Sequence, residues 1–126
     1  MTARIPAGLD GILRTASTAG RATLESLVGR PRVGLAVWDT DLRCVWVNGT
    51  LGRQDGIPAP RRQGRRPSRA LRGDADALET VMERVLADGA PVIGREYRVP
   101  AARGGRPERV LSVSFFRLDD PDGRPL

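Results

Sequence analysis

The chain has 126 residues, of which 40% are hydrophobic and 29% charged, and its formal net charge is +6. This composition is typical of one globular domain, and the lack of an apolar run near the roughly eighteen residues of a membrane span argues against a membrane protein. One cysteine and no histidine exclude an internal disulfide and a Cys/His zinc cluster, so we predict no metal site. The N-terminus also lacks the apolar block of a signal peptide, which predicts a cytoplasmic location.

The N-terminal segment, residues 7–29, predicts an amphipathic helix, in one piece or two. Its apolar side chains recur at helical spacing, and Gly29-Arg30-Pro31 ends the pattern: Leu9, Ile12, Leu13, Ala16, Leu24, Leu27 and Val28. We assign residues 1–30 to this helix and its linker. Two interpretations stay open, because the apolar stripe can cover the core of its own domain or meet a second copy in a homodimer.

Two short strands with a helix cap follow. The runs 33–38 and 44–48 flank a polar turn that begins at Asp39 and predict a hairpin, and the side-chain oxygen of Asn48 can cap a short helix. Residues 52–73 are rich in Gly, Pro and Arg and predict turns, with at most one helical turn near 68–71.

The second half of the chain predicts a long helix and two longer strands. The segment ADALETVMERVLADG, residues 75–89, has one apolar face, with Asp74 or Asp76 as its cap and Gly89 at its end. Residues 91–100 and 109–118 then alternate as strands, and Asp122-Gly123 predicts a turn. Strands on both sides of a helical middle, without strand–helix–strand alternation, indicate an α+β fold with an antiparallel sheet.

The stretch RRQGRRPSRALRG, residues 61–73, carries the entire charge excess of the chain. It holds six arginines and no acid, whereas fifteen arginines and fifteen acids balance elsewhere. Weak nucleic-acid binding through this stretch is the alternative function. Two observations argue against nucleic acid as a partner: the stretch has no aromatic residue on which bases could stack, and a charge run is usually a solvated surface.

The order of these elements and their sequence motifs resemble those of the PAS sensor family. GLAVWDTDLRCVWVN looks like the PAS opening, with Asp39 and Asn48 at the ends of its two strands. Gly56 and Gly64 match the boundaries of the short helices, and ADALETVMERVLADGAPV is similar to the connecting helix. The resemblance covers about residues 31–124, and we assign residues 31–126 to a PAS-like domain. The sequence is most similar to PAS modules that precede regulatory serine phosphatases in GC-rich bacteria.

The resemblance implies a five-stranded antiparallel sheet with short helices on one face around a small cavity. It also implies a bacterial signalling module that binds a small molecule or dimerises, often through a preceding helix, and controls an output domain outside this chain. The fifth PAS strand lies between the first and the fourth. Here it would begin near Arg124 and is missing, so we expect the sheet to be interrupted at its centre and the chain to be a fragment.

No residue pattern predicts catalysis or a known cofactor. PAS modules with haem usually use a His, and those with a cysteinyl flavin place the Cys in a helix, whereas Cys44 falls in a strand. Ser112 and Ser114 have no His to activate them, so we expect no enzyme activity.

A small-molecule cavity is the remaining prediction, with a solid core as its alternative. By strand alternation and helix position, nine residues are candidates for its lining: Leu35, Val37, Cys44, Trp46, Leu71, Val81, Tyr97, Ser112 and Ser114.

Overall fold

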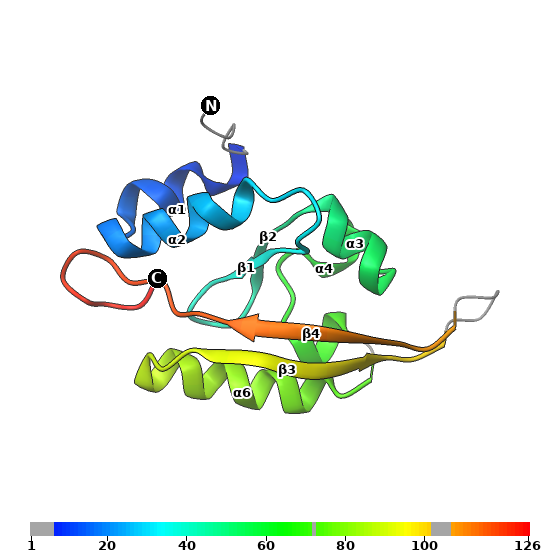
Figure 1. Ribbon diagram of the computed structural model, residues 1–126. Helices are drawn as coiled ribbons and strands as arrows, with labels where there is room; N and C mark the ends of the chain where they lie inside the picture. The colour runs from blue at the N-terminus through cyan, green and yellow to red at the C-terminus, as the bar shows by residue number, and fades with distance from the viewer. Residues whose placement is uncertain (1–6, 72, 102–106) are drawn as a thin grey trace.

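The computed structural model of the chain describes residues 7–71, 73–101 and 107–126, which form an α+β fold (Figure 1). The predicted fold class is confirmed. The helical elements are η1 (Ala7–Leu9), α1 (Asp10–Thr15), α2 (Thr18–Val28), α3 (Gly49–Asp55), α4 (Ala59–Arg62), α5 (Pro67–Ala70) and α6 (Ala75–Asp88). The strands are β1 (Ala36–Trp38), β2 (Cys44–Val47), β3 (Val92–Val99) and β4 (Arg109–Phe115).

The N-terminal segment forms two helices that pack on their own domain. The Ser17 hydroxyl oxygen accepts the Gly20 N–H at 3.1 Å and starts α2, so the helix is in two pieces. Leu9, Leu13 and Leu24 are at most 3% exposed and form one hydrophobic cluster with Val37 of β1. The apolar stripe therefore covers the core of its own domain in this structure.

The β1–β2 hairpin is held by the side chain of Asp39. Its Oδ1 accepts the N–H groups of Asp41 and Arg43, both at 2.9 Å, so the carboxylate orders the turn. Leu42 takes the left-handed conformation at φ 58° and its side chain is buried.

A bulge in this hairpin places Cys44 and Trp46 on opposite faces. Val37 pairs with Trp46, whereas the next residue, Trp38, pairs with Cys44, so one step on β1 matches two on β2. Trp46 packs with the N-terminal helices beside Gly8, and Cys44 is buried on the other face. Simple alternation, on which both residues were assigned to one face, does not hold here.

Asn48 ties β1 to α3, as its position at the end of β2 predicted. Its Oδ1 accepts the N–H groups of Leu51 at 2.9 Å and Leu35 at 3.0 Å, and its Nδ2 donates to the Val33 carbonyl at 2.7 Å. Gly56 ends α3 at φ 74°, a conformation that favours glycine. One residue therefore caps a helix and fixes the lead into the first strand.

The α6 helix lies against the β3–β4 hairpin. Leu78 of α6, Tyr97 and Val99 of β3 form a second cluster of buried residues. Gly89 ends α6 at φ 75°, as predicted. Asp74 takes the cap position, but its side chain makes no capping hydrogen bond. The segment 52–73 holds more helix than predicted, because α4 and α5 both form there.

The strands form two separate two-stranded antiparallel sheets, β1–β2 and β3–β4. Within the described residues, no strand lies between β1 and β4. After β4 the chain turns at residues 121–123, Asp119 bridges to Pro125, and the Leu126 N–H donates to the Leu118 carbonyl at 2.9 Å. The predicted turn is therefore present, and it returns the chain to the end of β4 (Figure 1).

Candidate ligand cavity

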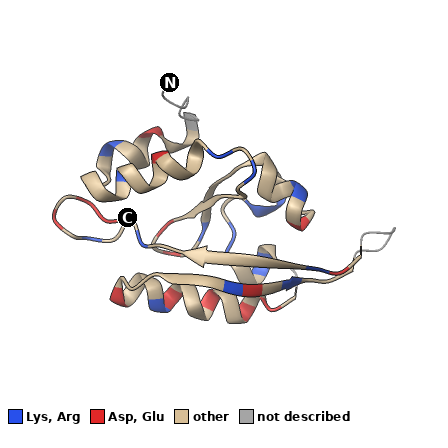
Figure 2. Ribbon diagram, viewed as in Figure 1, with Lys and Arg blue, Asp and Glu red and all other residues tan. Residues whose placement is uncertain are grey.

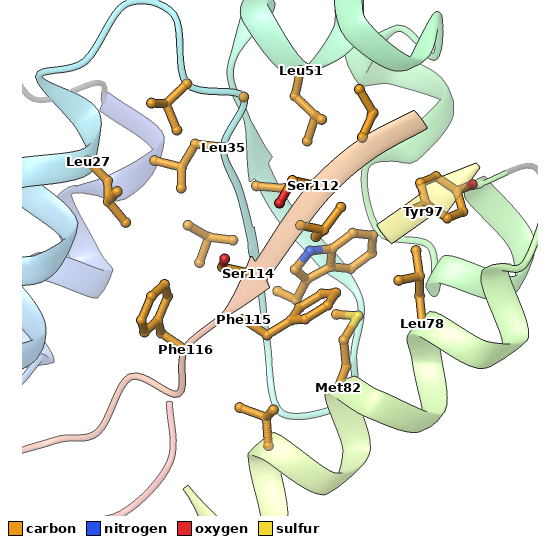
Figure 3. Close-up of a pocket in the computed structure, with 18 of the residues that line it drawn as sticks. Leu27, Leu35, Leu51, Leu78, Met82, Tyr97, Ser112, Ser114, Phe115 and Phe116 are labelled. Atoms are coloured by element: carbon orange, nitrogen blue, oxygen red, sulfur yellow. The ribbon is translucent and has the colours of Figure 1, made fainter. Parts of the chain in front are cut away.

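A cavity of about 710 Å³ lies between β1, β4 and α6. Its lining is mostly apolar, and Figure 3 shows side chains from both sides of β4 around it. Such a volume is within the range of ligand pockets in proteins. An open, mostly apolar hollow therefore lies between the two half-sheets.

The β4 strand divides the cavity into an inner and an outer side. The inner side faces α6, where Leu78, Met82 and Phe115 lie together (Figure 3). The outer side faces α2 and the start of β1, with Leu27 and Phe116. Alternate residues of β4 point to opposite faces, so Leu111, Val113 and Phe115 face the inner side and the polar Ser112 and Ser114 face the outer side.

The candidate residues from the sequence fall into three groups. Leu71 and Tyr97 line the inner side and belong to the α6 cluster. Leu35 and Val37, which pack with the N-terminal helices, and the exposed Ser112 and Ser114 of β4 line the outer side. Cys44, Trp46 and Val81 are not among the residues that line the cavity. Trp38, which was not among the candidates, lines the cavity. Only the position of the bulge between Val37 and Trp38 could have indicated this from the sequence.

A buried ion pair forms one polar part of the cavity wall. The guanidinium of Arg62 contacts the carboxylate of Asp55, with side chains 1% and 5% exposed. The Asp55 Oδ1 also accepts the Ile57 N–H at 3.0 Å, and Arg62 Nη2 lies 3.3 Å from the Ile57 carbonyl oxygen. Arg62 Nε is buried and has no hydrogen-bond partner among the described residues. Sequence reasoning missed this pair because Arg62 belongs to an arginine-rich run that reads as solvent-facing.

A second arginine of the run 61–73 is also engaged within the domain. Arg66 contacts Glu79 at 2.6 Å and Glu83 at 3.1 Å on α6, and the Ser68 N–H donates to Glu79 at 2.9 Å. Hydrogen bonding from the Ser68 side chain, followed by the Arg66 guanidinium and the Ser68 N–H, lowers the pKa of Glu79. Figure 2 shows basic and acidic residues interleaved along several elements. Part of the run therefore joins the α5 segment to α6 through the contacts of Arg66 and Ser68 with Glu79.

Burial raises the pKa of two groups beside the Asp55–Arg62 pair, the thiol of Cys44 and the phenol of Tyr97. Desolvation raises the pKa of the Cys44 thiol, and the nearby Arg62 guanidinium offsets part of that effect. Desolvation also raises the pKa of Tyr97, and the Asp55 carboxylate adds to it. Both groups are therefore held in their neutral forms, and Cys44 has the environment of an apolar filler rather than a nucleophile.

Comparison with known families agrees with this architecture. A family model described as PAS fold matches residues 31–126. The chain belongs to the PAS-fold family. No curated protein and no solved structure gave a match.

The four residues that carry the PAS resemblance each have a structural role. Asp39 orders the first hairpin, Asn48 caps α3, Gly56 ends it and Gly64, at φ 73°, turns the chain beside Cys44. A PAS domain is a sensory or regulatory module, so the chain is of that class. In the described part of the chain, no helix is long and apolar enough to cross a membrane, and no group of acidic, Cys or His side chains could hold a metal ion.

Proposed function

We propose that this PAS domain is a non-catalytic sensor that binds an apolar small molecule in its cavity and controls an output domain. The observation that carries the proposal is the apolar cavity between β1, β4 and α6, whose wall holds the buried Asp55–Arg62 pair. An output domain such as a serine phosphatase, which the wording of the sequence favours, would lie outside this chain. The cytoplasm remains the proposed location.

The homodimer through residues 1–30 is a separate part of the proposal. The apolar stripe of α1 and α2 packs against Val37, so a dimer that keeps this packing must use their exposed faces, where Arg21 and Glu25 pair at 3.3 Å. A solution mass measurement tests it, because a monomer across the accessible concentration range would contradict the dimer without affecting the cavity.

The small-molecule proposal is tested with the fluorescent probe 1-anilinonaphthalene-8-sulfonate, together with native mass spectrometry of the purified protein. We expect saturable probe binding, and Met82→Trp should abolish it because the larger side chain fills the inner side of the cavity. Ala87→Trp is the matched control, since Ala87 is exposed on the same helix. Cooperative unfolding of each variant shows that the probe reports a folded protein. Absence of both probe binding and a co-purified ligand would contradict the proposal.

A further inference from the structure

Three successive residues that follow β4 contact three different parts of the fold. They are Arg117, Leu118 and Asp119, and we call residues 117–119 the link. Arg117 and Leu118 are also among the residues that line the cavity. Figure 1 shows this stretch between the end of β4 and the last turn of the chain, beside the start of α2. A shift of β4 would therefore reach the N-terminal helices through the link.

Arg117 fastens the link to the end of α6. Its Nη1 donates to the Leu86 carbonyl at 3.1 Å, and this carbonyl belongs to the last turn of the helix, where oxygens lack partners within the helix. The guanidinium lies against Gly89, at which a Cβ would come within 2.8 Å of its Cζ. The helix dipole also favours a cation at this end. One side chain thus joins the end of α6 to the end of β4.

Asp119 fastens the other end of the link to α2. Its carbonyl oxygen accepts the Ser17 N–H at 2.6 Å, and Ser17 is the residue that caps α2. Its carboxylate lies 2.8 Å from Arg117 Nε, with the two side chains at most 30% exposed. Asp119 therefore contacts Arg117 through its side chain and Ser17 through its backbone, so the position of one contact depends on the other.

Leu118 adds an apolar contact between the link and the N-terminal helices. It packs against the hydrophobic cluster that these helices form with Val37. Its Cδ2 also lies near the first turn of α2, since a Cβ at Gly20 would be 3.5 Å from it. An apolar side chain and a backbone hydrogen bond therefore hold the start of α2 to the link.

A change in the spacing of β4 and α6 would break these contacts in order. Met82 of α6 and Phe115 of β4 lie together on the inner side of the cavity (Figure 3), so a molecule held between them increases that spacing. The Arg117 guanidinium then cannot reach both the Leu86 carbonyl and Asp119. Contacts at the end of a helix open at a lower free energy than the whole fold, so the start of α2 would loosen first.

We propose that the link transmits a displacement of β4 from α6 to the start of α2, so that an occupant of the inner side of the cavity loosens the N-terminal helices. The part played by the occupant rests on the function proposed above. The coupling of α6 to α2 through Arg117 and Asp119 does not, because it requires only the contacts of the ligand-free protein.

Amide hydrogen exchange of the purified protein tests this coupling. We expect Arg117→Met to speed exchange at residues 17–24 by at least about fivefold, because Asp119 loses the partner that positions it against Ser17. Asp119→Asn, which keeps the backbone carbonyl but removes the ion pair, should act in the same direction. Arg124→Met is the matched control, since Arg124 is exposed in the same turn and its loss should leave exchange at the wild-type rate.

A larger side chain inside the cavity tests the direction of the effect. Met82→Trp widens the space between α6 and β4 and should speed exchange at residues 17–24 by at least about fivefold, whereas Ala87→Trp on the exposed face should not. In the Arg117→Met background, Met82→Trp should add less than about twofold, because the link is already broken. Exchange in α3, Gly49–Asp55, should stay at the wild-type rate in every variant, which distinguishes local loosening from loss of the whole fold.

Three results would overturn the proposal: wild-type exchange at residues 17–24 in Arg117→Met, the full effect of Met82→Trp in the Arg117→Met background, or equal acceleration in α3. Saturating the wild type with the fluorescent probe should reproduce the acceleration that Met82→Trp causes. Probe binding without that acceleration would overturn the role of the link and leave small-molecule binding intact. Failure of the probe to bind would instead contradict the proposed function, and the variants would still decide whether the link couples α6 to α2.

Discussion

Replacing one member of the Asp55–Arg62 pair should destabilise the domain more than any other single change of charge. The Arg62→Met variant leaves the Asp55 carboxylate, 5% exposed, with the Ile57 N–H as its remaining bond. An unpaired buried charge costs about 3–5 kcal/mol. The Asp55→Leu variant leaves the guanidinium in the same condition, so we expect a similar loss.

The double variant decides whether the loss comes from the missing partner. With both charges removed, only the N–H and carbonyl of Ile57 lose their partners, and each unsatisfied buried group costs about 1–3 kcal/mol. We therefore expect the double variant to lose clearly less than the sum of the two single losses, with a coupling energy of about 2 kcal/mol or more.

Urea unfolding followed by tryptophan fluorescence measures these differences. The matched control is Arg98→Met, because Arg98 pairs with Glu108 at 3.0 Å on the surface, with side chains 68% and 51% exposed. An exposed pair contributes about 0–1 kcal/mol, so this variant should unfold almost as the wild type does. Single losses under about 1 kcal/mol that simply add would refute the argument that the pair is buried and coupled.

Three further predictions concern other parts of the fold. Asn48→Ala should lose about 2–3 kcal/mol in urea unfolding, since three hydrogen bonds disappear, whereas Asn48→Asp keeps the two that Oδ1 accepts; equal losses would contradict the capping role. Burial raises the pKa of Cys44 above its ordinary 9.0, so the buried thiol contributes its full stabilisation below pH 9 and loses it as the pH rises through the folded-state pKa. Between these two pKa values the wild type should lose more stability than Cys44→Ser, and parallel curves of unfolding free energy against pH for the two proteins would contradict this. Gly73→Ala should cost at least about 2 kcal/mol more than Gly123→Ala, because both have positive φ but only the first would place its Cβ 2.7 Å from a backbone carbonyl oxygen, and equal thermal denaturation midpoints would contradict it.

The sequence predicted the elements whose signals are local. The long apolar face of α6, the alternation of β4 and the cap at Asn48 all act within a few residues, so their periodicity and side-chain chemistry suffice. The separation of β1 from β4 was predicted from the strand order of the PAS family, because no local pattern in the sequence indicates it.

The parts of the cavity that sequence reasoning missed depend on contacts between distant residues. The bulge beside Val45 places Cys44 on the face opposite to Trp46, and no residue type at these positions predicts a bulge. The buried Arg62 pairs with Asp55, seven residues earlier, across the turn at Ile57. In a run of six arginines, composition cannot distinguish the buried Arg62, or Arg66 with its partners on α6, from arginines on a solvated surface.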